Sequence, residues 1–572
     1  MFSARHSVRL HDRLTRIFPE PLVLLFYAVI VGLFGGYGAV LFRKLITFLT
    51  PLFFTGIRNV FHDAGLGHAD VLLLPVIGLV VVSILVKYLA PEAKGHGVPE
   101  VMAAIAVNKS RIRGRIVLVK AVASAITIAS GGSVGREGPI VQIGSALGSK
   151  LGQSLGLSES RLRLMVACGA GAGIAATFNA PIGGVMFATE VILENFSLQN
   201  FTAIVISAVV SAAVGRAYLG NHPSFPMPSF VVGHFSIYWV YVIVGLIAGV
   251  WSFAYIKVLY GVEDWFGARN WPFWAKAAFG GALVGLIGIF FPQVFGVGYH
   301  SVDLALTARI SIELAVLLLV LKLLVTAITI GAGGSGGVFS PGLYMGSMLG
   351  VSVGGLLMHL NPHLGISPGA LAVFGMAGVF AGSAQAPVTA IMMLFEMTGD
   401  YNIILPLMIT AVLSATVAST LSKDTIYTWK LVRRGLDIRR KRHPDKMQSV
   451  TISEALPQDR FMLTTMMTVR DAWASFSNSP AWFALVKNEV GEVIGSVARA
   501  KVLEALNSQL AGEPISQLLP TQMVSIDVNQ TLADALTEMD RHNVTYLLVT
   551  SGGIGVDVIG SSDIIRVYRA VE

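Results

Sequence analysis

The chain has 572 residues, of which 54% are hydrophobic and only 13% are charged, and its net charge is +8. Soluble domains carry about 25% charged residues, and charge is costly in hydrocarbon, so the composition excludes an ordinary soluble protein and predicts one large membrane domain. The single cysteine, Cys168, excludes an intramolecular disulfide. Residues 450–572 carry 8 Lys or Arg and 14 Asp or Glu, a net charge of −6, which leaves +14 for the remainder. Basic loops beside anionic lipid explain this division better than nucleic-acid binding does.

Both ends of the predicted membrane domain carry basic residues. Residues 1–20 spread four arginines over an amphipathic pattern, which is typical of an interfacial helix rather than a signal peptide. A second basic cluster follows the last apolar segment, in a linker predicted at 431–449. Because basic loops stay on the inner side of a membrane, we expect a multi-pass protein of the cell membrane with both termini in the cytoplasm.

The apolar segments are of two kinds. Segments of about 20 residues, long enough to cross a bilayer, occur at 21–41, 71–89, 201–219, 237–259, 275–294, 312–329 and 403–421. Shorter pieces interrupted by glycine or proline lie between them, at 117–130, 139–155, 165–178, 181–191, 341–357, 370–381 and 387–395. Pieces this short do not span alone, and broken helices are tolerated where they line a cavity or pack against protein.

An internal repeat divides the membrane domain, residues 21–430, into halves at about 21–220 and 236–430. The stretch GGSVGREGP at 131–139 returns as GGSGGVFSP at 333–341, and residues 169–190 match 375–396. Chance similarity between glycine-rich segments is the alternative, but coincident prolines and a shared glutamate argue against it. Interrupted segments at corresponding positions of two halves indicate a transport site where the repeats meet.

Each glycine frame ends in a proline, Pro139 or Pro341, that suits the first turn of a helix. A helix N-terminus carries partial positive charge and unpaired N–H groups, so we interpret the two frames as half-helices directed at one anion site. The alternative is packing alone, which the G-x-x-x-G spacings behind both prolines also serve. A G-x-G-x-x-A match at 171–176 lies in a membrane helix, which excludes a dinucleotide site.

From residue 450 the composition is that of a soluble domain. Helix-like and strand-like segments alternate at 468–476, 482–487, 493–497 and 501–506, and the order returns at 531–541, 544–550, 557–559 and 563–567. This second repeat predicts tandem small α/β modules at about 450–510 and 513–572.

Three stretches carry a family resemblance. GHGVP at 95–99, GREGP at 135–139 and GVFSP at 337–341 resemble, in order and spacing, the signatures of the CLC family of chloride channels and chloride/proton antiporters. The tail resembles a tandem pair of CBS modules. The resemblance implies a multi-span α-helical membrane protein of two inverted-topology repeats with broken half-helices, plus a small cytoplasmic α/β CBS pair. It also implies a homodimer that conducts chloride or other small anions through a separate pathway in each subunit.

The resemblance assigns roles residue by residue. Glu137 matches the gating glutamate, whose carboxylate occupies an anion position and leaves it when protonated or displaced; the alternative is a structural ion pair with Arg136. Three groups would bind the anion: the N–H groups of Arg136, Glu137 and Gly138 at an outer position, those of Val338 and Phe339 at a central one, and the Tyr427 hydroxyl at its inner side.

Two positions depart from the family pattern. Val191 stands where antiporters often carry an inward glutamate that relays protons, which favours a passive gated channel, with a chloride/proton antiporter as the alternative. Glu190 does not replace that glutamate, because one residue along a helix turns the side chain by about 100°. His96 stands where serine is common; its imidazole could donate an N–H to the anion, and protonation would add positive charge. The alternative is a ring turned away from the path.

The tail departs from nucleotide-binding CBS modules. Ala498, Lys501 and Gly560 replace expected ribose contacts and only Asp563 is kept, which argues against ATP binding. We expect no enzyme, cofactor or metal site, because no convincing cluster of nucleophile, base or metal ligands lies in the apolar segments. A cation carrier would want more acidic residues on one path than Glu137, Glu190 and Glu396.

Overall fold

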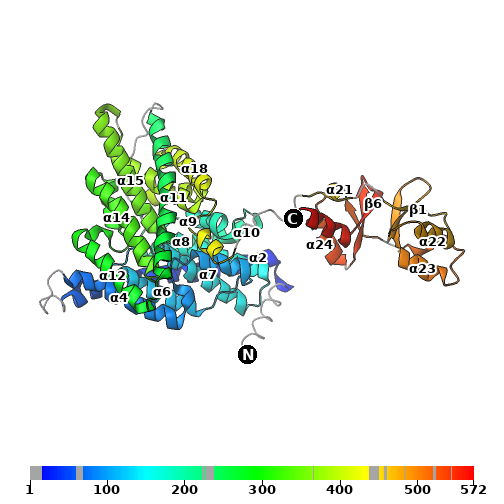
Figure 1. The fold of residues 1–572 in the computed structure, drawn as a ribbon, viewed down its shortest axis with the longest axis horizontal. Helices are drawn as coiled ribbons and strands as arrows, with labels where there is room; N and C mark the ends of the chain where they lie inside the picture. The colour runs from blue at the N-terminus through cyan, green and yellow to red at the C-terminus, as the bar shows by residue number, and fades with distance from the viewer. Residues whose placement is uncertain are drawn as a thin grey trace. The chain divides into compact units, whose positions relative to one another are not determined.

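The computed structural model describes residues 16–59, 69–196, 198–221, 224–225, 237–364, 366–436, 450–456, 460–481, 483–519, 523–542 and 544–571. The chain divides into two compact units, residues 1–436 and 437–572 (Figure 1). The first is helical and the second is α/β. The N-terminal helix predicted at 1–20 and the basic linker predicted at 431–449 lie largely outside the described residues.

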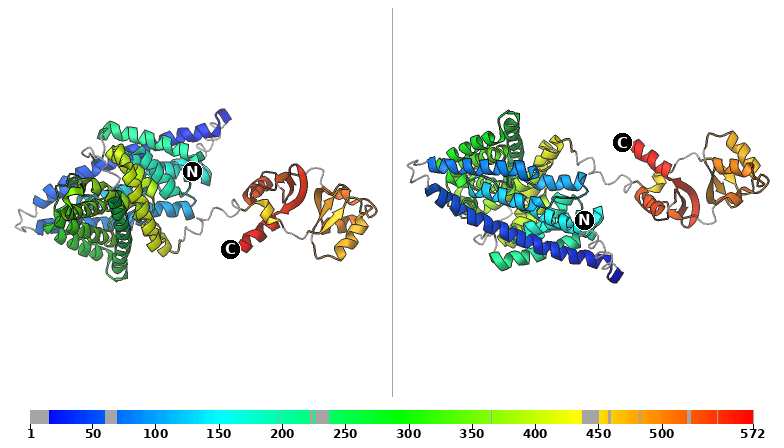
Figure 2. Two further views of the ribbon diagram at one scale, coloured as in Figure 1. Left: turned by 90° about the horizontal axis from the view of Figure 1, so that it is seen from above. Right: turned by 90° about the horizontal axis from the view of Figure 1, so that it is seen from below.

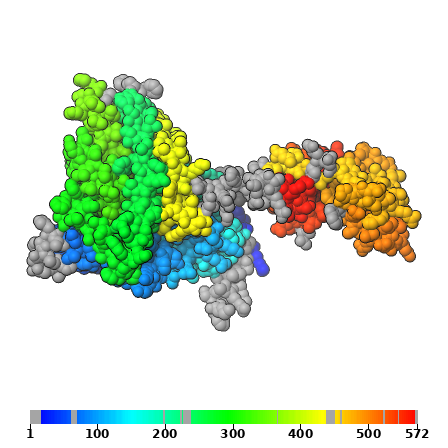
Figure 3. Space-filling model, viewed as in Figure 1, coloured from blue at the N-terminus to red at the C-terminus, as the bar shows by residue number. Residues whose placement is uncertain are grey.

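The first unit is built from two runs of helices, blue to cyan and then green to yellow in Figure 2. In the view of Figure 3, helices of the second run, in green and yellow, cover most of the visible face of the first unit. The first run contains α2 (Glu20–Pro51), α4 (Ala69–Leu89), α5 (Val98–Val107), α6 (Arg115–Ala129), α7 (Glu137–Ser154), α8 (Glu159–Phe178), α9 (Pro181–Met186) with the π-helix η3 (Phe187–Leu193), and α10 (Leu198–Leu219). The second contains α11 (Tyr238–Ala268), α12 (Phe273–Phe290), α13 (Tyr299–Leu306), α14 (Ile312–Gly331), α15 (Phe339–Leu360), α16 (Pro368–Ala384), α17 (Pro387–Thr398), α18 (Ile404–Leu421) and α19 (Thr428–Arg433).

Among the described residues, nine helices are long and apolar enough to cross a membrane. They include all seven segments predicted to span. The other two correct the prediction, because the pieces at 165–178 and 341–357 are parts of α8 and α15, which have 20 and 22 residues. Hydropathy missed the start of α8 because its first turn is polar, with Glu159, Arg161 and Arg163. The helices α6, α16 and α17 remain short, with 15, 17 and 12 residues.

The G-x-x-x-G spacings behave as predicted. Helix α7 packs on α8, and α15 packs on α16. A Cβ added at Gly144 would collide with the Gly169 carbonyl, and one at Gly350 with the Leu371 carbonyl. The backbones therefore approach as closely as only glycine permits, and the same packing is used in both halves.

The two glycine frames lie against each other. The Gly135 N–H donates to the Gly337 carbonyl at 2.7 Å, and the Gly337 N–H donates back to Gly135 at 2.6 Å. On either side, the Ser133 N–H donates to Thr329 Oγ1 at 3.2 Å and the Ser335 N–H donates to Thr127 Oγ1 at 3.3 Å. This reciprocal pairing joins the halves at the starts of α7 and α15, where the transport site was predicted.

The second unit contains two small sheets of the same topology. Strands β1 (Met462–Thr464), β2 (Phe483–Lys487) and β3 (Val493–Ala498) form one sheet, and β4 (Ser525–Asp527), β5 (Tyr546–Ser551) and β6 (Ile554–Gly560) form the other. In each sheet the first pair is parallel and the second antiparallel. Their helices are α21 (Ile452–Ala455), α22 (Val469–Ser477), α23 (Arg499–Leu506), α24 (Leu532–His542) and α25 (Ser561–Val571). The predicted helices and strands occur in the predicted order, but α21, β1 and β4 were not predicted.

The two modules exchange short segments. Ile452 and Ala455, at the start of the tail, pack in the core of the second sheet. Ile515 and Leu518, which follow the first module in sequence, pack in the core of the first sheet. A third small core lies between the sheets, where Leu485 and Val493 meet Val558. The modules therefore form one unit.

Candidate functional site

Two half-helices begin beside the paired glycine frames. Helix α7 starts at Glu137 with Arg136 as its N-cap residue, and α15 starts at Phe339 with Val338 as its N-cap residue. Neither helix is capped by the side chain of its own N-cap residue. The first-turn N–H groups of a helix have no carbonyl partner in the helix, so both ends offer donors to a negative group.

The Glu137 carboxylate occupies one of these ends. Its Oε2 accepts the Ser340 N–H in the first turn of α15 at 3.3 Å, and its Oε1 accepts the Tyr299 hydroxyl at 3.0 Å. The side chain is buried, and Arg136 Nε lies 3.8 Å from Oε1. The ion pair with Arg136 is thus the longest of these contacts. A carboxylate of the first half lies where α15, from the second half, attracts an anion.

A small cavity of about 10 Å³ lies beside the carboxylate. Space of that size holds about one water molecule. The predicted site residues that line it are His96, Glu137, Gly138, Val338, Phe339 and Tyr427. The structure therefore brings together every predicted anion-site residue except Arg136, whose side chain contacts Glu137 from outside the cavity lining.

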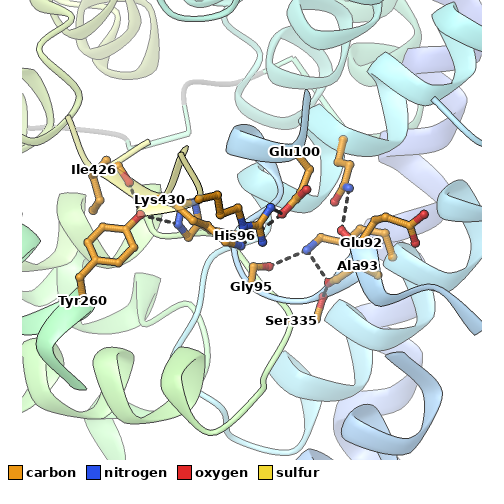
Figure 4. A network of polar contacts seen from close by, with 12 residues as sticks. Glu92, Ala93, Gly95, His96, Glu100, Tyr260, Ser335, Ile426 and Lys430 are labelled. Carbon is orange, nitrogen blue, oxygen red and sulfur yellow. Dashed lines mark hydrogen bonds and ion pairs between the residues drawn. The ribbon is translucent and has the colours of Figure 1, made fainter. Parts of the chain in front are cut away.

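His96 is buried and is one of the residues that line the cavity. Its Nε2 lies 3.0 Å from the Tyr260 hydroxyl, which donates to the Ile426 carbonyl at 2.6 Å (Figure 4). A hydroxyl has one proton to donate, so Tyr260 accepts from Nε2–H, and the Nδ1 lone pair is left. Within the described part of the chain, Nδ1 has no hydrogen-bond partner. The neutral ring therefore gives its only N–H to Tyr260, in contrast to the predicted donation to an anion.

Sequence reasoning missed Tyr299. It begins α13 after Gly298 and donates to Glu137, while the Arg136 guanidinium lies 5.0 Å from its ring centroid. The loop that positions it is the second copy of the loop that carries His96. GHG at 95–97 corresponds to GVG at 296–298, an offset of 201 that was visible in the sequence.

A buried lysine holds each copy of this loop. Lys120 on α6 donates to the carbonyls of Ala93 and Gly95 at 2.9 and 2.6 Å. Lys322 on α14 donates to the equivalent carbonyls of Val294 and Gly296, both at 2.9 Å. Since unpaired charge is costly in this setting, each ammonium is stabilised by the carbonyls of the loop it orders.

The shared glutamates of the repeat are helix caps. Glu190 accepts the N–H groups of Val388 and Thr389, at the start of α17, at 3.2 and 2.7 Å. Glu396 accepts those of Ile182 and Gly183, at the start of α9, at 3.0 and 2.7 Å. Glu190 is therefore bound to another helix, which agrees with the prediction that it does not replace the missing relay carboxylate.

Val191 is buried in η3 next to Glu190. Its side chain has no group that takes up a proton. The position at which antiporters often carry a relay glutamate is therefore apolar in this chain.

In the tail, Asp563 is already bound within the protein. It accepts the Gly560 N–H at 3.2 Å and an N–H of the buried Arg460 guanidinium at 3.3 Å. Arg460 also lies 3.2 Å from Asp557. Burial raises the pKa of the Asp557 carboxyl, and the Arg460 charge opposes that shift. The predicted nucleotide residue is thus part of a buried ion cluster.

Comparisons with known proteins place this geometry in a family. The family model described as "Voltage gated chloride channel" matches residues 78–419, and the CBS domain model matches residues 515–570. Among curated proteins, the H(+)/Cl(−) exchange transporters ClcA of Salmonella schwarzengrund and Salmonella typhimurium are similar. Each is 29% identical over 446 residues, which cover 76% of this chain and 94% of the relative.

Solved structures agree in fold. A slow cyanobacterial Cl−/H+ antiporter superposes with a TM-score of 0.67 at 25% identity and covers 73% of this chain and 99% of its own. A eukaryotic CLC transporter, at 18% identity and a TM-score of 0.62, matches 95% of this chain and 98% of its own, so the shared fold includes the tail. These relatives are named as exchangers or transporters, so the comparisons do not support the passive channel that Val191 had favoured.

Proposed function

Since the chain belongs to the CLC family of membrane anion transport proteins, we propose that it exchanges chloride for protons and that Glu137 is the group both ions act on. The proposal takes the antiporter in place of the channel. It is supported by the exchange transporters to which the chain is similar, and by the position of the Glu137 carboxylate at the start of α15.

The observation that carries the proposal is the contact between Glu137 and the Ser340 N–H, next to a cavity lined by the N-terminal residues of two helices. Donors that bind a carboxylate also bind chloride, because both are small anions attracted to a helix N-terminus. Chloride and the carboxylate therefore compete for one place. Protonation removes the charge that makes Glu137 a competitor, so proton uptake and anion passage are linked at this residue.

In the proposed site, the N–H groups of Val338 and Phe339 face the central anion, and those of Arg136, Glu137 and Gly138 face the outer one. Tyr427 lies at the inner side of the central position. We also propose a homodimer of the cell membrane with cytoplasmic termini, as the family resemblance and the basic residues at both ends of the membrane unit imply.

Val191 is the observation that favours the second candidate, a passive chloride channel. The test is the zero-current potential of liposomes containing the purified protein, at fixed chloride concentrations, with and without a pH gradient. An exchanger gives a potential that moves with the pH gradient. A potential that ignores the pH gradient while chloride passes would overturn the proposal in favour of the channel.

A further inference from the structure

We propose that His96 is the proton carrier on the inner side of this site, between the cytoplasmic solution and Glu137. The inference rests on the proposed proton-coupled exchange and answers the question that Val191 raises. A proton that moves from the inner solution to Glu137 needs an acceptor on the way. Val191, at the relay position, cannot accept a proton.

The geometry meets three requirements of such a carrier. His96 and Glu137 are both among the residues that line one small cavity. The ring is buried, and its Nδ1 has no partner among the residues the structure describes. The ring nitrogen that does have a partner, Nε2, is held by Tyr260, which is fixed in turn by the Ile426 carbonyl. The hydrogen bonds therefore leave one lone pair free to receive a proton.

The direction of this lone pair separates a proton acceptor from an anion donor. If neutral His96 were an anion ligand, its N–H would point into the cavity and its lone pair would be satisfied elsewhere. Tyr260 imposes the opposite tautomer, because its own proton goes to Ile426 at 2.6 Å. A lone pair repels chloride but accepts a proton, so the neutral ring is arranged for proton uptake.

The proton step balances without any other reactant. Nδ1 takes a proton from water on the inner side, and the ring becomes an imidazolium. The imidazolium then gives that proton to the Glu137 carboxylate, directly or through the one water for which the cavity has room, and returns to its neutral form. Glu137 becomes an uncharged acid and releases the first turn of α15 to chloride. Imidazole suits this task because a ring nitrogen with a free lone pair can take up a proton and release it again.

The charges around His96 make its protonation depend on the anion. The groups on neighbouring elements are Lys120 on α6, Lys430 on α19 and Arg434 after it, Glu100 on α5, Tyr260 on α11, Tyr427 before α19 and Glu137 on α7. Lys430 and Arg434 pair with Glu100 at 3.4 and 2.8 Å, so part of their charge is compensated. Burial and the remaining positive charge oppose an imidazolium, whereas chloride or ionised Glu137 in the cavity favours it. His96 is thus easiest to protonate when an anion occupies the site.

The experiment measures chloride and proton fluxes in liposomes made with the full-length protein. His96→Asn keeps a polar group of similar size for Tyr260 to contact, but the asparagine side chain does not take up a proton. His96→Ser is a second variant in case the first fails to assemble. The matched control is His300→Ser, because His300 is exposed and lies outside the cavity lining. We expect proton flux in the His96 variants to fall by about tenfold or more while chloride still passes, and the control to behave as the unmodified protein does.

A rescue variant distinguishes a carrier from a packing residue. Val191→Glu, added to His96→Asn, places a carboxylate at the usual relay position and should restore chloride-driven proton movement. If a His96 variant keeps the proton-to-chloride ratio of the unmodified protein, the inference is overturned and the proposed exchange stands. If the unmodified protein itself moves chloride without protons, the proposed exchange fails, and with it the need for a carrier.

Discussion

Glu137 differs from Glu190 and Glu396 although all three carboxylates lie at the N-terminus of another helix. Glu190 accepts two N–H groups of α17 and the Thr389 hydroxyl at 2.6–3.2 Å. Glu396 accepts two N–H groups of α9 at 2.7 and 3.0 Å. Glu137 accepts a single backbone N–H at 3.3 Å and a tyrosine hydroxyl at 3.0 Å, and it borders a cavity.

The difference shows that the attraction between a carboxylate and a helix N-terminus can produce either a fixed helix cap or a side chain that an anion can displace. Short hydrogen bonds to the first turn of a helix hold a carboxylate in place. Longer bonds beside a cavity let it exchange with an anion. The account therefore predicts transport effects at Glu137 and stability effects at the other two.

The largest expected effect is at Glu137. Glu137→Gln imitates the protonated side chain and removes the charge that competes with chloride, so the path should stay open more of the time. We expect chloride flux to become nearly independent of external pH, measured as chloride efflux from liposomes over a range of pH. If acid still activates chloride flux in this variant, Glu137 is not the gating residue.

The next effect should be a loss of stability at the fixed caps. Glu396→Ala and Glu190→Ala each remove at least two charge-assisted hydrogen bonds and leave helix N–H groups unpaired, a loss of about 3 kcal/mol. Thermal unfolding in detergent should show a lower midpoint, while the chloride flux that remains should keep its dependence on pH. A pH response that disappears in either variant, as in Glu137→Gln, would place these carboxylates in the transport path.

A smaller effect is expected at Tyr299, which holds Glu137 with one hydroxyl. Tyr299→Phe removes a hydrogen bond to a charged group, worth about 1.5 kcal/mol, and so favours release of the carboxylate by about tenfold. Chloride flux at neutral pH should rise. Tyr344→Phe is the control, because that hydroxyl contacts the Gln293 carbonyl rather than Glu137. Equal behaviour of the two variants would show that the Tyr299 hydroxyl does not restrain the gate.

The smallest effect should be that of ATP on the tail. Asp563 lies in the first turn of α25 but is held by Gly560 and Arg460, so a nucleotide would have to displace a buried arginine. Lys501 is also engaged, with the Leu518 carbonyl at 2.8 Å. We expect no heat of ATP binding to the full-length protein in calorimetry. Micromolar affinity would contradict this part of the account.

Sequence patterns were sufficient where a feature depends on neighbouring residues. The glycine frames predicted paired helix starts because proline and glycine dictate local backbone geometry, and the alternating segments of the tail predicted its modules. The start of α8 was missed because its first turn is polar. The contacts of Tyr299 and His96 were missed because their partners lie 162 and 164 residues away. The free ring nitrogen of His96 is set by a third residue, Ile426, because its carbonyl takes the Tyr260 proton. No local sequence pattern connects Ile426 to His96.

The most direct test of the account is proton movement driven by a chloride gradient in liposomes, compared among the unmodified protein, Glu137→Gln and Glu396→Gln. The account predicts that chloride leaving the vesicles draws protons in through the unmodified protein. It predicts that Glu137→Gln abolishes proton uptake while chloride still passes, and that Glu396→Gln, which removes the charge of a fixed cap, retains the original ratio of protons to chloride. Proton uptake that persists in Glu137→Gln would contradict the claim that this carboxylate is the movable one.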